Sequence, residues 1–273
     1  YVSGVLETYY FGANLLAHIL PENENQPLLK VPVAPPDGKE RQVTDGIYAK
    51  EEVTAGIRSA MEILEQEKPD KIITIGGNCI VSQASFDYLH GLYDNLGIIW
   101  IDAHPDVSQV KDEYPNAHAM VLGSLMGSGD PALSGLMKNR KFQADEILYV
   151  GLQGLHDYQE QFLRDAKVNF KVQTEEFVSE KEILEFTERF DHILVHLDID
   201  VLDPGLFHST YFANGELVGD GSGGGRMTVE ALSGILKLIT GKAAVVGFTV
   251  AEYIHFHEHR LHKMFSSLEL FQR

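Results

Sequence analysis

The sequence predicts an α/β protein in which a mostly parallel sheet is covered by helices on both faces. Between residues 71 and 250, short apolar runs of strand length alternate with stretches that have the spacing of amphipathic helices. The run at residues 98–101 carries no polar side chain, which is typical of a strand that is buried on both faces. Alternating strands and helices form parallel sheets, and the sites of such sheets lie beyond the carboxyl ends of the strands.

The elements before residue 71 are supported by spacing and by helix-breaking residues. Residues 10–19 have apolar side chains at helical spacing, and the polar run at residues 22–27 ends that helix. Residues 30–33 form a short apolar run, which favours a strand. Residues 51–67 repeat apolar or small side chains every three or four positions, and Pro69 ends this second helix.

From residue 71 onward the alternation is regular. We expect strands at residues 71–75, 97–101, 146–151, 170–173, 192–199 and 243–250, and helices at residues 82–90, 118–126, 158–166, 180–189 and 228–239. No low-complexity segment divides the 273 residues, so we expect one domain over residues 1–273. The chain opens at Tyr1 without a methionine, which suggests that an N-terminal segment is missing.

Composition narrows the class of partner. The chain has 22 Lys and Arg residues against 40 Asp and Glu residues, which gives a formal net charge of −18. Such a charge argues against nucleic acid or an anionic membrane as a partner and favours a small cationic molecule. The longest apolar runs are far shorter than the roughly 20 residues that span a bilayer. A single cysteine, Cys79, excludes an internal disulfide, and no signal peptide is evident, so we expect a cytoplasmic protein.

Acidic residues and histidines cluster where the predicted strands end. Asp102, His104 and Asp106 occupy every second position after one strand, and Asp198 and Asp200 follow another in the same way. An isolated acidic pair of this kind is usually a turn or a helix cap. The carboxylates of two such patterns at one edge of a sheet would repel each other unless cations lay among them. Carboxylate and imidazole side chains together suit a pair of manganese-like ions as ligands.

The ordered motifs resemble those of the ureohydrolase superfamily, which comprises arginases, agmatinases and formiminoglutamases. Residues 76–79 (GGNC) are similar to its Gly-Gly-Asp-His, 102–106 (DAHPD) to its Asp-Ala-His-x-Asp, and 116–118 (NAH) to its Asn-x-His. Asp198-Ile199-Asp200 with Asp203-Pro204 resembles its Asp-x-Asp-x-x-Asp-Pro, and Glu252 its late glutamate. The resemblance implies a three-layer α/β/α sandwich on a sheet of about eight strands.

The resemblance also implies a dinuclear metal hydrolase. Two divalent ions, most typically manganese, would be held by Cys79, Asp102, His104, Asp106, Asp198 and Asp200, with Asp102 and Asp198 bridging. Metal-activated hydroxide would cleave a C–N bond of a linear guanidino or amidino compound. Glu252 and Asn116 would bind the substrate, His118 would move a proton, and Asp106 would belong to the catalytic set through its metal. Relatives commonly form trimers or hexamers, so the resemblance implies a homo-oligomer.

The chain departs from the family pattern at the metal site. Cys79 stands where the family has histidine, and Asn78 stands where it has aspartate. A thiolate shifts preference from manganese toward zinc or iron, whereas a protonated thiol is hardly a ligand. Three outcomes stay open: a thiolate-ligated dinuclear site, a site with one weak metal position, and a degraded site in a pseudoenzyme with a regulatory or assembly role.

The substrate side departs from the arginase pattern as well. Tyr114-Pro115 and residues 151–154 lack the serine and the acid that hold the amino-acid head of arginine in arginases. We therefore expect another guanidino or amidino compound. The glycine-rich run at residues 219–225 lacks the order of a phosphate loop and predicts a mobile lid that precedes the helix at 228–239. Four histidines between residues 255 and 262 are interpreted as a solvated tail.

Overall fold

The computed structural model describes residues 1–3, 8–21, 25–174, 176–215 and 223–255. In these ranges five parallel strands form one sheet in the order β3-β7-β6-β4-β5. Their bounds are Ile72–Ile75 for β3, Leu96–Ile101 for β4, Ile147–Val150 for β5, His192–Asp198 for β6 and Val245–Ala251 for β7. The predicted α/β class is confirmed, although this sheet has five described strands where about eight were expected.

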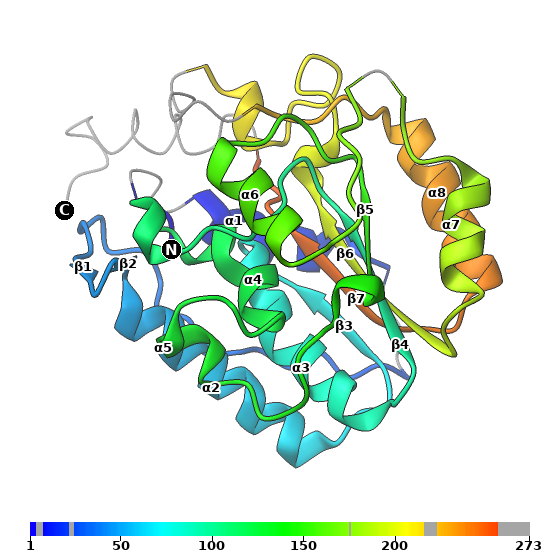
Figure 1. Ribbon diagram of the computed structural model, residues 1–273. Helices are drawn as coiled ribbons and strands as arrows, with labels where there is room; N and C mark the ends of the chain where they lie inside the picture. The colour runs from blue at the N-terminus through cyan, green and yellow to red at the C-terminus, as the bar shows by residue number, and fades with distance from the viewer. Residues whose placement is uncertain (4–7, 22–24, 175, 216–222, 256–273) are drawn as a thin grey trace.

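Helices cover both faces of the sheet. Figure 1 shows α7 and α8 together on one side, and α2, α3 and α4 on the other. The helices span Thr8–Ile19 (α1), Lys50–Glu67 (α2), Ser82–Leu92 (α3), Val121–Leu125 (α4), Pro131–Ser134 (α5), Asp157–Asp165 (α6), Glu180–Thr187 (α7) and Val229–Lys242 (α8). The result is the expected three-layer α/β/α arrangement.

The core is built on β4, whose six residues are all buried. Successive side chains of a strand point to opposite faces of the sheet. Accordingly, Ile98 and Trp100 pack in a cluster with residues of α2 and α3, whereas Ile99 and Ile101 pack with residues of α7 and α8. The strand is apolar throughout because both of its faces contact helices.

Local signals explain where several helices begin and end. The Ser179 hydroxyl accepts a hydrogen bond from the Glu182 amide, and the Glu182 carboxylate accepts one from the Ser179 amide, so a capping box starts α7. The Thr228 hydroxyl caps the start of α8 by accepting a hydrogen bond from the Ala231 amide. Helix α2 ends at Glu67 and is followed by the C-cap residue Lys68, whose φ of 51° is left-handed, immediately before Pro69.

Two predicted strands are wrong. Residues 30–33 pair with no described strand, and Val31 and Val33 remain exposed. Gln173 contacts the edge of β5, but residues 170–173 form no ladder with it, because the buried Gln173 side chain takes the hydrogen bonds of that edge. Its Oε1 accepts from the amides of Gly151 and Val178, and its Nε2 donates to the Tyr149 carbonyl.

A short hairpin was not predicted. Strand β1, Val43–Thr44, pairs with β2, Ile47–Tyr48, around Asp45 and Gly46. Both turn residues have positive φ, of 48° and 80°, which is the conformation that an Asp-Gly hairpin turn adopts. The proposed lid at residues 219–225 and the histidines beyond residue 255 lie largely or wholly outside the described residues.

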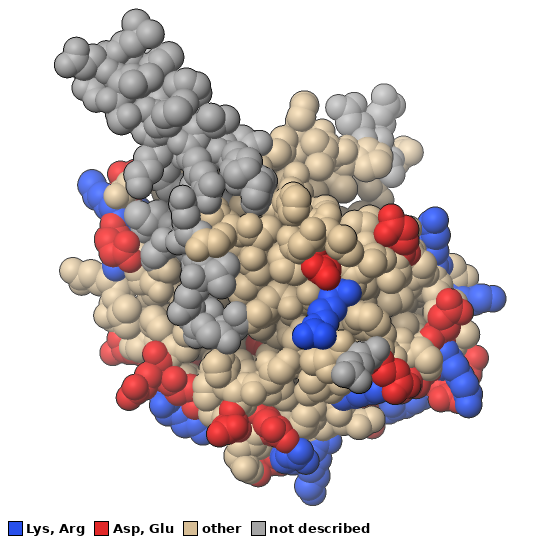
Figure 2. All heavy atoms as spheres, turned by 90° about the horizontal axis from the view of Figure 1, so that it is seen from above, with Lys and Arg blue, Asp and Glu red and all other residues tan. Residues whose placement is uncertain are grey.

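Charged side chains are spread over the face of the molecule that is seen from above (Figure 2). Seen from above, Lys and Arg side chains are interspersed with acidic ones around the rim and form no single basic patch on this face (Figure 2). Among the described helices, none combines the length and the apolar character that crossing a bilayer requires.

Candidate metal centre

The two acidic patterns meet where β4 and β6 end. These strands are neighbours, and Ile101 pairs with Leu197, so the residues that follow them, Asp102 and Asp198, lie next to each other. Both carboxylates are almost completely buried. The expectation that the two patterns converge at one edge of the sheet is thus met by the register of the strands.

Potential metal ligands form three overlapping groups. Asp102, His104 and Asp200 make one group. Cys79, Asp102, Asp106 and His196 make a second, and Cys79, Asp198 and Glu252 make a third. Within each group the ligand atoms lie within 4.8 Å of one another. All six ligands expected from the sequence therefore lie in these overlapping groups. Asp102 and Cys79 each belong to two groups, whereas Asp198, the other predicted bridging ligand, belongs to one.

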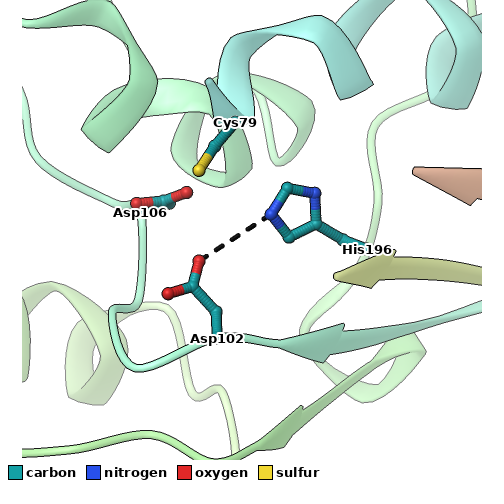
Figure 3. Close-up of side chains that lie close together, drawn as sticks. All are labelled: Cys79, Asp102, Asp106 and His196. Atoms are coloured by element: carbon teal, nitrogen blue, oxygen red, sulfur yellow. Dashed lines mark ion pairs between the residues drawn. The ribbon is translucent and has the colours of Figure 1, made fainter. Parts of the chain in front are cut away.

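His104 and Cys79 occupy opposite ends of this cluster. His104 Nδ1 lies 3.0 Å from Asp200 Oδ2 and 3.5 Å from Asp102 Oδ1. The Cys79 thiol donates to Asp198 Oδ2 at 2.9 Å and lies 3.7 Å from Glu252 Oε1. Figure 3 shows the Cys79 side chain pointing toward Asp106, Asp102 and His196. The sulfur thus stands within the cluster, where the family pattern places histidine.

Strained backbone positions carry two of the acids. Asp106 and Glu252 have φ angles of 52° and 62°, which are uncommon for residues with a side chain. The Asp106 carbonyl accepts hydrogen bonds from the amides of Leu122 and Gly123, and the Glu252 amide donates to Gly77. These bonds hold the strained residues in place, and such strain concentrates at functional sites.

Residues 76–79 bring the chain into the cluster. A Cβ atom on Gly76 would lie 2.2 Å from Val81 Cγ2, so only glycine fits where β3 turns into the 3-10 turn Cys79–Val81. At Gly77 a Cβ atom would lie 3.3 Å from Tyr9 Cβ. The two glycines therefore permit close packing of the protein on itself beside Cys79.

Burial and mutual repulsion raise the pKa of the clustered acids. Burial, followed by Asp102, raises the pKa of Asp106 well above its usual value, and burial, followed by Asp200, does the same for Asp198. The pKa of Glu252 rises to about 8 for the same two causes, burial and Asp200. Burial and nearby Asp106 raise the pKa of the Cys79 thiol. Cations within the cluster would reverse these shifts, because they stabilise the ionised forms.

The residues present fit divalent metal ions. Among the described residues, His104 Nε2, Asp106 Oδ2 and His196 Nε2 are buried without a hydrogen-bond partner. Buried polar atoms are seldom left in this state, because an unmade hydrogen bond costs about 1–3 kcal/mol. Imidazole, carboxylate and thiol donors around such atoms are the donors that first-row divalent metals take.

A cavity of about 430 Å³ opens onto the cluster. The predicted substrate and proton-transfer residues Glu252, Asn116 and His118 all line it, together with metal-cluster residues. The Asn116 Oδ1 accepts a hydrogen bond from the Ser3 amide at 2.8 Å, and His118 meets the Tyr114 ring edge to face, with centroids 6.0 Å apart. The N-terminal residues Val2, Ser3 and Tyr9 also line the cavity.

Sequence reasoning missed two groups of cavity or cluster residues. The first is His196, which lies two positions before Asp198 and therefore continues the same every-second-residue pattern. The second is a set of aromatic residues that line the cavity: Tyr9, Tyr158, Tyr211 and Phe212. Tyr9 donates a hydrogen bond of 2.5 Å to Glu252 Oε2 across 243 residues of sequence, and no local pattern signals such a contact.

The cavity lining also bears on the substrate. Among the described lining residues there are four acids and neither Lys nor Arg. Tyr114 and Gly154 line the cavity in the segments where the sequence lacks the arginase serine and acid. The buried Gln153 amide is used within the protein, because it donates to the carbonyls of Gly151 and Gln173.

Comparison with known proteins places the chain in a family. A model of the arginase family matches residues 30–260. The arginase of Staphylococcus aureus (strain COL) is 30% identical over 141 residues, which are 48% of this chain and 46% of that protein. The match with the arginase of Bacillus caldovelox likewise covers 47% of that protein, so the matched segment spans about half the length of these curated relatives.

Solved structures share the fold. The arginase of Entamoeba histolytica, crystallised with L-ornithine, superposes with a TM-score of 0.66 at 20% identity, covering 82% of this chain and 76% of that one. A putative agmatinase of Clostridium difficile gives a TM-score of 0.56 at 18% identity, over 93% and 84% of the two chains. Because the family model covers well over half of the sequence, and the ordered motifs meet in one buried cluster, the chain belongs to the arginase family.

Proposed function

We propose that this protein is a metal-dependent hydrolase that cleaves a C–N bond in a linear guanidino or amidino compound. The observation that carries the proposal is the pair of ligand groups that share Asp102 beside the cavity. Asp102, His104 and Asp200 would hold one ion, and the carboxylates next to Cys79 would help to hold the other. When bound, two divalent ions supply hydroxide at neutral pH and stabilise the negative charge that develops on water attack.

The charges of the cavity support a cationic substrate. Glu252 is buried, faces the cavity and is fixed by the Tyr9 hydroxyl, so its carboxylate is positioned to accept hydrogen bonds from a guanidinium or amidinium group. His118 lines the same cavity and is assigned the transfer of a proton to the leaving amine. Asn116 contributes an amide group on the wall beside it.

The walls of the cavity disfavour L-arginine as the substrate. An α-amino acid head needs a partner for its ammonium group and donors for its carboxylate. Tyr114 and Gly154 line the relevant segments, and neither supplies an acid or a cation. We therefore assign a linear guanidine or amidine that lacks the amino-acid head.

The two ions need not be the same metal. The Asp102, His104 and Asp200 group offers only nitrogen and oxygen donors, which suit manganese. The thiol of Cys79 favours zinc or iron at the other end of the cluster. Cys79 has to remain reduced to serve as a ligand, which agrees with a cytoplasmic location.

A release assay tests the proposal. The purified full chain is loaded with manganese, zinc or iron and screened for urea or ammonia release over guanidino and amidino compounds with different tails. We expect turnover with at least one compound and a loss of at least about 100-fold in kcat/KM for Glu252→Gln, which removes a charge-assisted contact of about 3 kcal/mol.

The matched control is Asp87→Asn. Asp87 is also a buried acid, but it lies on α3 and accepts hydrogen bonds from the amides of Lys138 and Asn139, outside the cavity. Its variant should retain turnover. Absence of turnover with every compound and every metal, together with substoichiometric metal, would instead support the pseudoenzyme alternative, which the described residues do not favour.

A further inference from the structure

One buried imidazole has no role in the proposed reaction. His196 lies within β6 and is completely buried. Its Nδ1 lies 2.8 Å from the Ser82 hydroxyl, whereas its Nε2 is 3.8 Å from Asp102 Oδ2 and has no hydrogen-bond partner. A bare nitrogen alone does not identify a ligand, because His90 Nε2 is in the same state outside the ligand groups; the donors that surround His196 Nε2 decide the assignment.

The surroundings of this nitrogen are a set of metal donors. Figure 3 shows the His196 ring, the Cys79 thiol and the carboxylates of Asp102 and Asp106 pointing toward one another. Their ligand atoms all lie within 4.8 Å of one another, so small side-chain shifts would bring all four within bonding distance of one ion. All four side chains are buried, and Cys79 and Asp106 also line the cavity.

We infer that His196 is a ligand of the ion at the Cys79 end, together with Cys79, Asp102 and Asp106. The inference rests on the metal dependence proposed above, and it adds a ligand that the sequence motifs do not contain. One sulfur, one nitrogen and two carboxylate oxygens form a mixed donor set that would suit zinc better than manganese. The histidine in β6 thus supplies the imidazole that position 79 lacks.

The residues around His196 hold it in the orientation of a ligand. Its ring stacks on Trp100, with centroids 3.7 Å apart and planes at 9°. Trp100 also donates from Nε1 to Asp102 Oδ2 at 3.0 Å, so one side chain positions two ligands. If the Nδ1–H group donates a hydrogen bond to the Ser82 hydroxyl, Nε2 carries no proton and keeps the lone pair that a metal needs. Such supporting contacts orient histidine ligands generally.

A cobalt titration separates this assignment from a purely structural histidine. Metal-free full chain is titrated with Co²⁺, which gives a thiolate-to-cobalt charge-transfer absorption when Cys79 is a ligand, and bound metal is counted by elemental analysis. Wild type should bind two ions, one of them with this absorption. His196→Phe keeps an aromatic ring against Trp100 and should lower the affinity for the thiolate-linked ion more than 100-fold, while the other ion still binds.

A second, more conservative variant keeps the test valid if His196→Phe does not fold. Ser82→Ala removes only the hydroxyl that faces His196 Nδ1 and should weaken the same ion by about 10- to 100-fold. The matched control is His90→Phe. His90 is likewise buried, stacks on Phe142 and pairs its Nδ1 with a protein oxygen, the Arg140 carbonyl, but it belongs to none of the ligand groups. Its cobalt binding should match wild type.

The outcomes distinguish this inference from the proposed function. Wild-type affinity for the thiolate-linked ion in both His196→Phe and Ser82→Ala would overturn the role of His196, whether or not the protein is a hydrolase. Two bound ions whose affinity depends on His196, in a protein that hydrolyses no guanidino or amidino compound, would support this metal site and overturn the hydrolase proposal.

Discussion

Removing divalent metal should lower the unfolding temperature of this protein by about 10–20 °C. An ion that binds only the folded state at 100 times its dissociation constant adds about 2.7 kcal/mol of stability, and the two ligand groups that share Asp102 predict two ions. Their sum is about 5 kcal/mol. The unfolding temperature of a domain of this size changes by about 2–4 °C for each kcal/mol of stability, which gives the range of 10–20 °C.

The assay is thermal unfolding of the full chain in metal buffers, from excess chelator to saturating metal. The unfolding temperature of wild type should rise with free metal, because cations relieve the repulsion among buried acids whose pKa is raised in their absence. Asp102→Asn removes the shared carboxylate and should abolish most of this rise, whereas Asp87→Asn should retain it. An unfolding temperature of wild type that is the same in chelator and in saturating metal would refute the reasoning.

Three further predictions concern single side chains. Burial lowers the pKa of His90 to about 4, below its value in the unfolded chain, so its contribution to stability falls as the pH drops from about 6.5 to 4. His90→Phe should therefore remove on the order of 2 kcal/mol of the acid-induced loss of unfolding free energy, and an unchanged pH profile would contradict this. Cys79→His should raise the affinity for manganese measured by equilibrium dialysis, since imidazole suits this ion better than a thiolate; an unchanged affinity would mean that position 79 is not a ligand. Gly12→Ala would place a Cβ atom 1.8 Å from the Tyr253 carbonyl and should lower both stability and turnover, whereas Gly56→Ala, with open space around its Cβ, should stabilise α2 by up to about 1 kcal/mol in urea unfolding.

The sequence predicts the parts of the site that lie close together along the chain. Asp102, His104 and Asp106 stand out because a strand that is apolar on both faces ends abruptly in regularly spaced ligands. The same every-second-residue spacing also includes His196, because positions 196 and 198 lie on one side of β6, but a histidine inside a buried strand is usually a core residue. Only the register of β4 and β6 shows that its ring lies on Trp100 beside Asp102.

The parts that the sequence does not predict depend on contacts between distant segments. Tyr9 reaches Glu252 because α1 packs beside β3, and the spacing of either residue gives no hint of it. Residues 170–173 have the composition of a strand, yet the Gln173 side chain takes hydrogen bonds that a neighbouring strand would otherwise make. Tertiary hydrogen bonding of this kind overrides local propensity.

The most direct test of the metal centre is an anomalous diffraction measurement on crystals of the full chain grown with zinc or cobalt. The account predicts two anomalous peaks beside the Asp102 carboxylate. One should lie among Cys79, Asp106 and His196, and the other between His104 and Asp200. A single peak, or peaks only at the surface while the cluster remains empty, would contradict the assignment of a two-metal site that shares Asp102.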